Sequence, residues 1–168
     1  MKRLWIPALA VTACLFSGCA FGDSVWEPAL TGADEAEPAR SLKDLVERAE
    51  VVLAGEISGV SREFSSVIID VLVTEVILGS GIAERVHIEV PPLDSLRDFV
   101  EENPHGQAMW FLTPAGAPGR YAIASNAGVI AQEEGSLRTI ADRTLSDQVL
   151  PEGVKSMHGL AEAVQKIS

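Results

Sequence analysis

Two long runs of β-branched residues, VVLAGEISGV (51–60) and SSVIIDVLVTEVIL (65–78), limit most strongly what this chain can fold into. Val and Ile are favoured on pleated strands, where their branched side chains pack against neighbours. The alternation of apolar and polar residues within each run predicts two long strands joined at residues 61–64. The core of the fold is therefore expected to be β-sheet.

The second run changes phase along its length. Its odd positions from 67 to 73 place Val or Ile on one face, whereas Val76 and Leu78 fall on the other face. A β-bulge adds one residue to a strand and so shifts this alternation. We therefore expect a bulge near Thr74 and Glu75 that returns all of these side chains to the core, as barrel strands often require.

Shorter patterns outline the remaining elements. In chain order they predict a helix capped by Ser41, a strand at 85–90, a helix at 93–100, strands at 108–114 and 120–125, a hairpin at 128–141 and a helix at 156–167. Three strands, a helix and two more strands is the element order of an OB-fold. The predicted fold class is mainly β: a small OB-like closed β-barrel, with five core strands plus an extra hairpin and short flanking helices. Another small barrel or sandwich built from the same strands stays open.

The N-terminal segment resembles the signal peptide of a bacterial lipoprotein. A basic start precedes an apolar run at 4–16, and LFSGC (15–19) is similar to a lipobox, with Phe16 where leucine is usual. The resemblance implies that Cys19 is lipidated and begins the mature chain. Cleavage after Ala20 by an ordinary signal peptidase, an uncleaved anchor and a buried helix remain as alternatives.

This resemblance, together with the composition of residues 20–40 and the strand patterns that follow, divides the chain into three segments. Residues 1–18 would be the lipoprotein signal peptide, 19–40 the lipidated Cys19 with a flexible acidic tether, and 41–168 the OB-like domain. One acyl chain holds a protein only marginally, whereas two or more anchor it stably. The expected location is the extracytoplasmic face of the cell membrane, with the lipid bilayer bound through acylated Cys19.

Charge limits the partners further. The formal net charge is −11, and removal of Lys2 and Arg3 with the signal peptide would lower it to −13. Nucleic-acid binding depends on Lys and Arg displacing counterions from phosphates, so a nucleic-acid partner is not expected. The same balance argues against a basic patch for anionic lipids, so the lipid alone would hold the protein at the membrane.

Within the predicted domain, AEVVLAGEISGV, VIIDVLVTEVILGS and MWFLTP are similar to the corresponding strands of netrin-like OB domains, the type found in tissue inhibitors of metalloproteinases. Those inhibitors chelate a protease zinc through a free N-terminal cysteine that disulfides hold to the barrel. Here Cys19 would be lipidated on a flexible tether, with no cysteine to pair with. The resemblance therefore implies the fold and not metalloprotease inhibition by that mechanism.

Catalytic and metal-binding signals are sparse. The sequence contains no HExxH or GxSxG motif, and its three histidines are far apart, so we expect no cofactor. Asp94, Asp98 and Glu101 fall on one predicted helical face, where they either face water or share a cation such as calcium. We expect the solvated face, and these three carboxylates are the metal candidate to test.

OB barrels usually meet ligands on strands two and three and on the neighbouring loops. This face and the loop PAGAPGR (114–120) would carry the candidate binding residues Asp70, Thr74, Arg85, His87, Glu89 and Arg120. The surface is mixed rather than aromatic, which favours a protein partner over stacked bases or sugars. The alternatives are a cell-surface hydrolase, for which Asp70 and His87 are the candidate residues, and an inhibitor of an extracytoplasmic enzyme.

Overall fold

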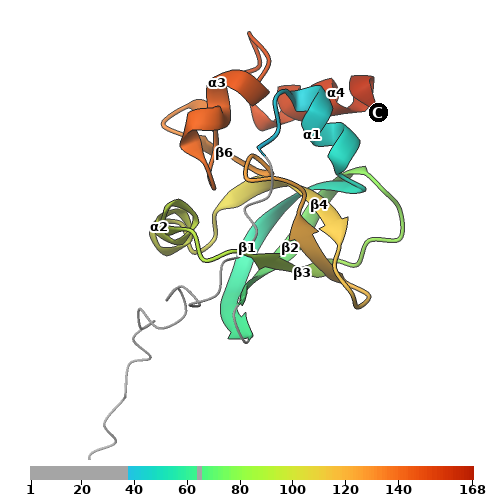
Figure 1. Cartoon of the computed structure of the whole chain (residues 1–168), viewed down its shortest axis with the longest axis vertical. Helices are drawn as coiled ribbons and strands as arrows, with labels where there is room; N and C mark the ends of the chain where they lie inside the picture. The colour runs from blue at the N-terminus through green and yellow to red at the C-terminus, as the bar shows by residue number, and fades with distance from the viewer. Residues whose placement is uncertain (1–37, 64–65) are drawn as a thin grey trace, which may run out of the picture.

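The computed structural model describes residues 38–63 and 66–168 (Figure 1). The predicted signal peptide, Cys19 and nearly all of the predicted tether lie outside the described residues. The elements in chain order are α1 (Leu42–Arg48), β1 (Val51–Glu63), β2 (Ser66–Leu78), β3 (Arg85–Val90), α2 (Asp94–Glu102), β4 (Gln107–Pro114), β5 (Arg120–Ile123), β6 (Val129–Glu133), β7 (Ser136–Thr139), η2 (Arg143–Leu145), α3 (Ser146–Val149) and α4 (Met157–Ile167).

The strands form one seven-stranded sheet in the order β1-β2-β3-β5-β4-β6-β7, and β1 also pairs with β4. This additional pairing closes β1, β2, β3, β5 and β4 into a barrel. The β3–β5 pair is parallel, whereas the other pairs are antiparallel. A closed five-stranded barrel with β6 and β7 as an extra hairpin confirms the predicted OB-like fold class.

One apolar cluster fills the barrel. Leu53, Ile69, Ile88 and Trp110 come from four different strands and are fully buried in it. Helix α2 adds Leu96, Phe99 and Val100 to the same cluster. Because α2 connects the end of β3 to the start of β4, and its apolar residues join the barrel cluster, it covers the barrel end where β3 ends and β4 begins.

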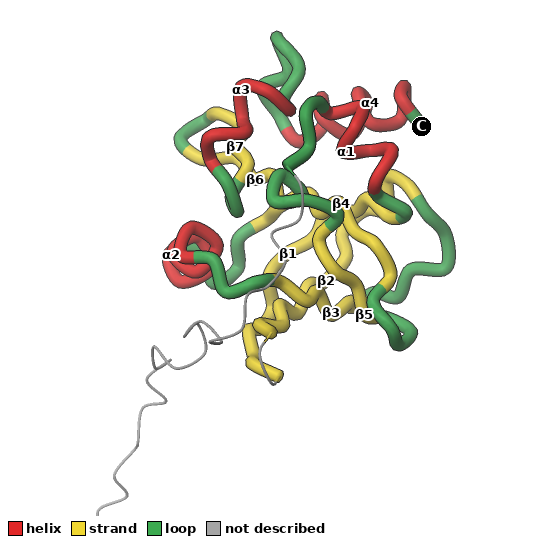
Figure 2. The backbone as a smooth tube through the Cα atoms, viewed as in Figure 1, coloured by secondary structure: helices red, strands yellow, loops and turns green. Residues whose placement is uncertain are grey.

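A second apolar cluster lies outside the barrel, between its wall and the helices. Figures 1 and 2 show α1, α3 and α4 gathered at one end of the molecule, above the strands. Strand β4 is buried on both faces because Trp110 points into the barrel cluster, while its neighbours Met109 and Phe111 point into the helix-covered cluster. This explains why the sequence of β4 reads as a continuous apolar run rather than an alternation.

The long β1–β2 hairpin contains the predicted bulge. Ala54 pairs with Glu75 and Gly55 with Val73, so Thr74 is the extra residue on β2. The expectation that the bulge returns Val76 to the core is wrong, because the Val76 side chain is 40% exposed. The register shifts again between Val76 and Leu78, and Ile77 and Leu78 pack against the helix-covered cluster.

Gly55 allows the two long strands to approach closely. A Cβ atom there would overlap Val71 Cγ1 and lie 2.8 Å from the backbone oxygen of Leu72. Real Cβ atoms essentially never come within 3.0 Å of a heavy atom outside their own residue and its two chain neighbours. A side chain at this position would therefore push β1 and β2 apart.

The folded domain includes residues ahead of the predicted boundary at Ser41. Ala39 is fully buried in the helix-covered cluster, and its N–H donates to Ser125 Oγ at 3.0 Å. Ser41 Oγ caps α1 by accepting the Asp44 N–H, while Asp44 Oδ2 accepts the Arg40 N–H. Among the described residues, no helix is long and apolar enough to cross a bilayer.

Candidate functional site

Four neighbouring strands place one row of residues side by side on the barrel wall. Gly59 of β1 pairs with Asp70 of β2, Asp70 pairs with His87 of β3, and His87 pairs with Arg120 of β5. We call Gly59, Asp70, His87 and Arg120 the outer row. Side chains alternate between the two faces of a strand. The residues that flank Asp70 and His87 along their strands are buried in the barrel cluster, so these two side chains face away from the core.

An aspartate–histidine pair lies at the centre of the outer row. Asp70 Oδ1 lies 2.6 Å from His87 Nδ1, and the two side chains are 30% and 46% exposed. Gly59 leaves room beside them, since a Cβ there would lie 3.2 Å from Asp70 Oδ2. A carboxylate on Nδ1 favours the tautomer with hydrogen on that atom, which leaves the Nε2 lone pair for an external donor.

A second ion pair ties the hairpin tip to the outer row. Arg120 Nη2 donates to both carboxylate oxygens of Glu63, at 2.8 and 2.6 Å. This hydrogen bonding raises the pKa of Arg120 above its usual value, and the charge of Glu63 adds to the effect. Ser66, on the other arm of the hairpin tip, donates to Glu89 of β3. The last residue of β1 and the first residue of β2 are thus held against β5 and β3, respectively.

The structure brings together most of the predicted binding residues. Asp70, His87 and Arg120 share the outer row, and Glu89 lies two residues beyond His87 on β3. Arg85 lies two residues before His87 and is exposed, opposite Leu72 of β2. Thr74 lies apart, because it occupies the bulge beyond the last β2–β3 pair.

Sequence reasoning missed Glu63 and Ser66. Glu63 lies within the predicted connection at 61–64 and Ser66 two residues after it, where too little alternation remains to indicate which way a side chain points. It also did not predict that Leu72 would remain 38% exposed beside the outer row. Leu72 adds an apolar contact point to a surface that is otherwise charged.

The acidic face of α2 does not converge on a metal site. Arg97 on the same helix lies 3.2 Å from Asp94 and 3.3 Å from Asp98. The hydrogen bond to Asp98 raises the pKa of Arg97, with Asp94 and Glu101 contributing through their charge. Throughout residues 38–63 and 66–168, no three His, Cys, Asp or Glu side chains are grouped so that they could hold a metal ion.

No model of a known protein family matches this chain, and no curated protein matches its sequence. The outer row is therefore interpreted from its own geometry: an exposed Asp–His pair, an Arg–Glu pair and a nearby exposed leucine on the barrel face that OB-folds use for ligands.

Proposed function

We propose that this protein is a membrane-anchored extracytoplasmic lipoprotein whose barrel is an interaction module for another protein. The observation that carries the proposal is the outer row, which aligns Asp70, His87 and Arg120 across three adjacent strands. Strands two and three with the adjoining loops are the ligand face of OB-folds in general. We also propose, from the sequences of its strands, that the barrel is similar to netrin-type OB domains.

The chemistry of this face suits a protein partner. Exposed ion pairs such as Asp70–His87 and Arg120–Glu63 contribute little to folding stability, so they can exchange partners at low cost. Complementary charges of both signs favour specific orientation and fast association of two proteins. The exposed Leu72 supplies apolar area beside them.

The anchor is argued from the sequence of the N-terminal segment. The lipobox-like ending at Cys19 supplies a lipidation site, and a mature net charge of −13 leaves few basic residues for binding anionic headgroups. A lipid on Cys19 would keep the barrel close to the membrane, where its partner would also be found. An inhibitor of an extracytoplasmic enzyme is one form that such a module could take.

Surface crosslinking of cells, followed by mass spectrometry, tests the proposal with four proteins. The expected result is one dominant captured partner for the wild type, strongly reduced for Arg120→Ala and for Cys19→Ala. Arg143→Ala is the matched control, since Arg143 is also an exposed arginine that pairs with one glutamate, Glu133. Equal capture by wild type and Arg120→Ala would refute the binding face. Firm membrane attachment of Cys19→Ala would refute the anchor.

A hydrolase is the second candidate, favoured by the 2.6 Å contact between Asp70 and His87. In such an enzyme His87 Nε2 would act as a general base on a water molecule, with Asp70 holding the imidazole. The neighbouring hydroxyls of Ser58 and Ser66 already donate hydrogen bonds to other groups. A hydrolytic activity of the wild type that survives the double substitution Asp70→Asn, His87→Gln would dismiss this role.

A further inference from the structure

A second row of residues lies next to the outer row on the outside of the barrel. Glu56 of β1 pairs with Leu72 of β2, and Leu72 pairs with Arg85 of β3. We call these three residues the second row. Val71 and Val86, which precede and follow Leu72 and Arg85 on their strands, are buried in the barrel cluster. Because side chains alternate along a strand, Leu72 and Arg85 both point outward and lie side by side.

The guanidinium of Arg85 is exposed and forms no hydrogen bond or ion pair with any residue that the structure describes. Its neighbours explain this. Leu72 lies opposite it on β2, and on the other side of β3 the loop 115–119, which carries no charged side chain, ends at Gly119, whose carbonyl accepts the His87 N–H. The N–H donors of Arg85 therefore remain available to a partner.

The two carboxylates in the two rows each have a partner already. Asp70 Oδ1 lies 2.6 Å from His87 Nδ1, and Glu56 Oε1 lies 3.3 Å from His105 Nδ1. The charge that remains unpaired in these rows is the positive charge of Arg85. A surface that complements this part of the barrel therefore supplies a carboxylate.

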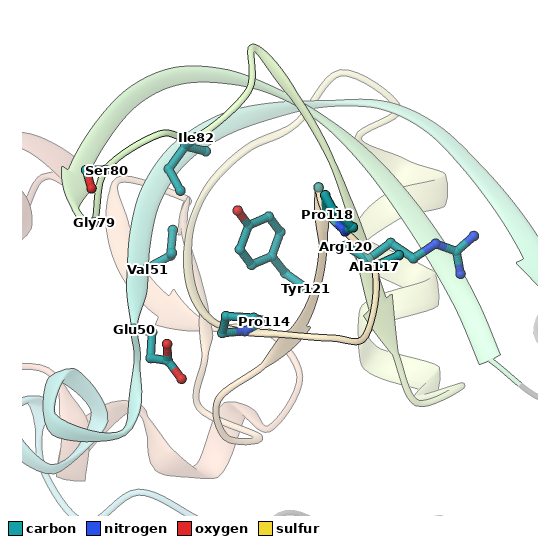
Figure 3. Close-up of a pocket in the computed structure, with 11 residues that line it drawn as sticks. Glu50, Val51, Gly79, Ser80, Ile82, Pro114, Ala117, Pro118, Arg120 and Tyr121 are labelled. Carbon is teal, nitrogen blue, oxygen red and sulfur yellow. The ribbon is translucent and has the colours of Figure 1, made fainter.

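Arg120 is the other arginine in the two rows, and it differs from Arg85. It borders the open pocket at the mouth of the barrel, but Figure 3 shows its guanidinium directed away from the Tyr121 ring. It donates to both carboxylate oxygens of Glu63. A partner carboxylate at Arg120 would replace these hydrogen bonds, whereas one at Arg85 would add new hydrogen bonds.

Two carboxylates near the second row limit how acidic a partner can be. Glu84 precedes Arg85 and Glu75 follows the bulge after Leu72; both are exposed and form no ion pair with a described residue. Together with the net charge of −11, they repel a run of acidic residues. A single carboxylate among apolar side chains therefore fits this surface better than an acidic run.

We propose that Leu72 and Arg85 anchor the interaction face and bind a protein segment in which one Asp or Glu lies beside an apolar side chain. The carboxylate would accept two hydrogen bonds from Arg85, while the apolar side chain would pack on Leu72, which is 38% exposed. Arginine is enriched in protein interfaces for this reason. The inference rests on the proposed interaction function and names the chemistry of its partner.

Three peptides that differ in one side chain test the charge. Acetyl-Ala-Leu-Glu-Leu-Ala-amide and its glutamine and lysine versions would each be titrated into the full ¹⁵N-labelled chain at neutral pH, with backbone amide shifts followed by NMR. The glutamate peptide should cause saturable shifts at residues 70–73 and 85–87. It should bind roughly two- to fivefold more tightly than the glutamine peptide, the range of an exposed ion pair, and the lysine peptide should bind most weakly. Equal affinity of the glutamate and lysine peptides, or no shift at these residues, would overturn the proposal.

Variants of the second row separate charge from shape. Arg85→Gln should bind the glutamate peptide no better than the glutamine peptide, while Arg85→Lys should retain only part of the preference, because lysine lacks the planar pair of donors. Leu72→Ala should weaken all three peptides. Lys155→Gln is the matched control, since Lys155 is also exposed and has no partner among the described residues, but lies between α3 and α4. An unchanged affinity of Arg85→Gln for the glutamate peptide would overturn the anchor.

The crosslinking experiment separates this inference from the proposed function. Where the wild type captures one dominant partner, Arg85→Gln should lose most of it and Lys155→Gln should not. Equal capture by the wild type and Arg85→Gln would overturn the anchor and leave the interaction function in place. Absence of a dominant partner for the wild type would refute the interaction function, and with it the assignment of a protein segment to Leu72 and Arg85.

Discussion

Two regions on the outside of the barrel differ in what covers them: a covered face beneath the helices and a bare face around the outer row. On one face Val52, Met109 and Phe111 point outward and are buried beneath the helices. On the other face Asp70 and His87 point outward and remain partly exposed. Both faces belong to strands that bury the opposite side in the same barrel core.

The difference follows from the side chains that point outward. An apolar outward side chain is stabilised when a helix removes it from water, so α1, α3 and α4 gather where such residues are concentrated. A charged outward side chain loses hydration when it is covered, so the outer row stays bare. We therefore expect substitutions on the covered face to change stability, and substitutions on the bare face to change binding.

The largest expected effect is at Phe111, which is fully buried beneath the helices. Phe111→Ala should lower the free energy of unfolding by about 3–5 kcal/mol, because it removes apolar contacts and leaves a cavity. Urea denaturation of the full chain, followed by far-ultraviolet circular dichroism, measures this loss. A loss no larger than that of Leu72→Ala would contradict the comparison between the two faces.

A smaller loss is expected at Gly55, in the segment of β1 that pairs with both β2 and β4. Gly55→Ala should cost about 1–3 kcal/mol of unfolding free energy, because the new Cβ would overlap Val71 Cγ1 and the backbone of Leu72. Gly159→Ala within α4 is the matched control. Alanine favours helix and meets only ordinary or slightly tight contacts there, so the control should be neutral or stabilising. Equal stability of the two variants would show that β1 and β2 can separate.

Asp44, at the start of α1, should make the stability of the domain sensitive to acid. The hydrogen bond from Arg48 lowers the pKa of Asp44 below its ordinary value of 3.8, and the Arg40 N–H contributes to the same shift. A depressed folded-state pKa gives stability that is present above pH 3.8 and lost as the pH falls through the folded value. Asp44→Asn should therefore be less stable than wild type at neutral pH, and the difference should shrink below pH 3.8.

Denaturation midpoints measured across this pH range test the Asp44 prediction. Glu47→Gln on the same helix is the control, because Glu47 is exposed and does not cap α1. If the difference in stability between wild type and Asp44→Asn were the same at all pH values, stability would not depend on the protonation of Asp44, and the prediction would be contradicted.

The smallest effect on stability is expected on the bare face. Leu72→Ala should change the free energy of unfolding by about 0.5 kcal/mol or less, because the side chain is already 38% exposed. The same variant should reduce capture of a protein partner, since it removes apolar area beside the outer row. A loss of stability comparable to that of Phe111→Ala, in the same urea experiment, would mean that this face is structural.

Much of the fold could be predicted from local patterns. Alternation revealed the long strands, and the phase change in the second run located the bulge at Thr74. The exposure of Val76 could not be predicted, because it depends on a second register shift against β1. Elements η2 and α3 were also missed, since short turns of helix have little periodicity.

The candidate site was predictable in part for the same reason. Asp70, His87 and Arg85 each break or alternate with an apolar pattern, which indicates that they point outward. Glu63 and Ser66 lie at a hairpin tip, and their contacts with Arg120 and Glu89 span 57 and 23 residues of sequence. No local pattern contains information about such contacts.

The amino-acid sequence indicates most of the strands and helices, because their apolar patterns depend on neighbours a few residues apart. It also determined the charge balance that argues against nucleic acid. Three features became visible only in the folded chain: β1 closes onto β4, helices cover one part of the barrel surface, and Asp70, His87 and Arg120 lie in one row. Those features depend on strand register and on packing between distant segments, which are set when the barrel closes.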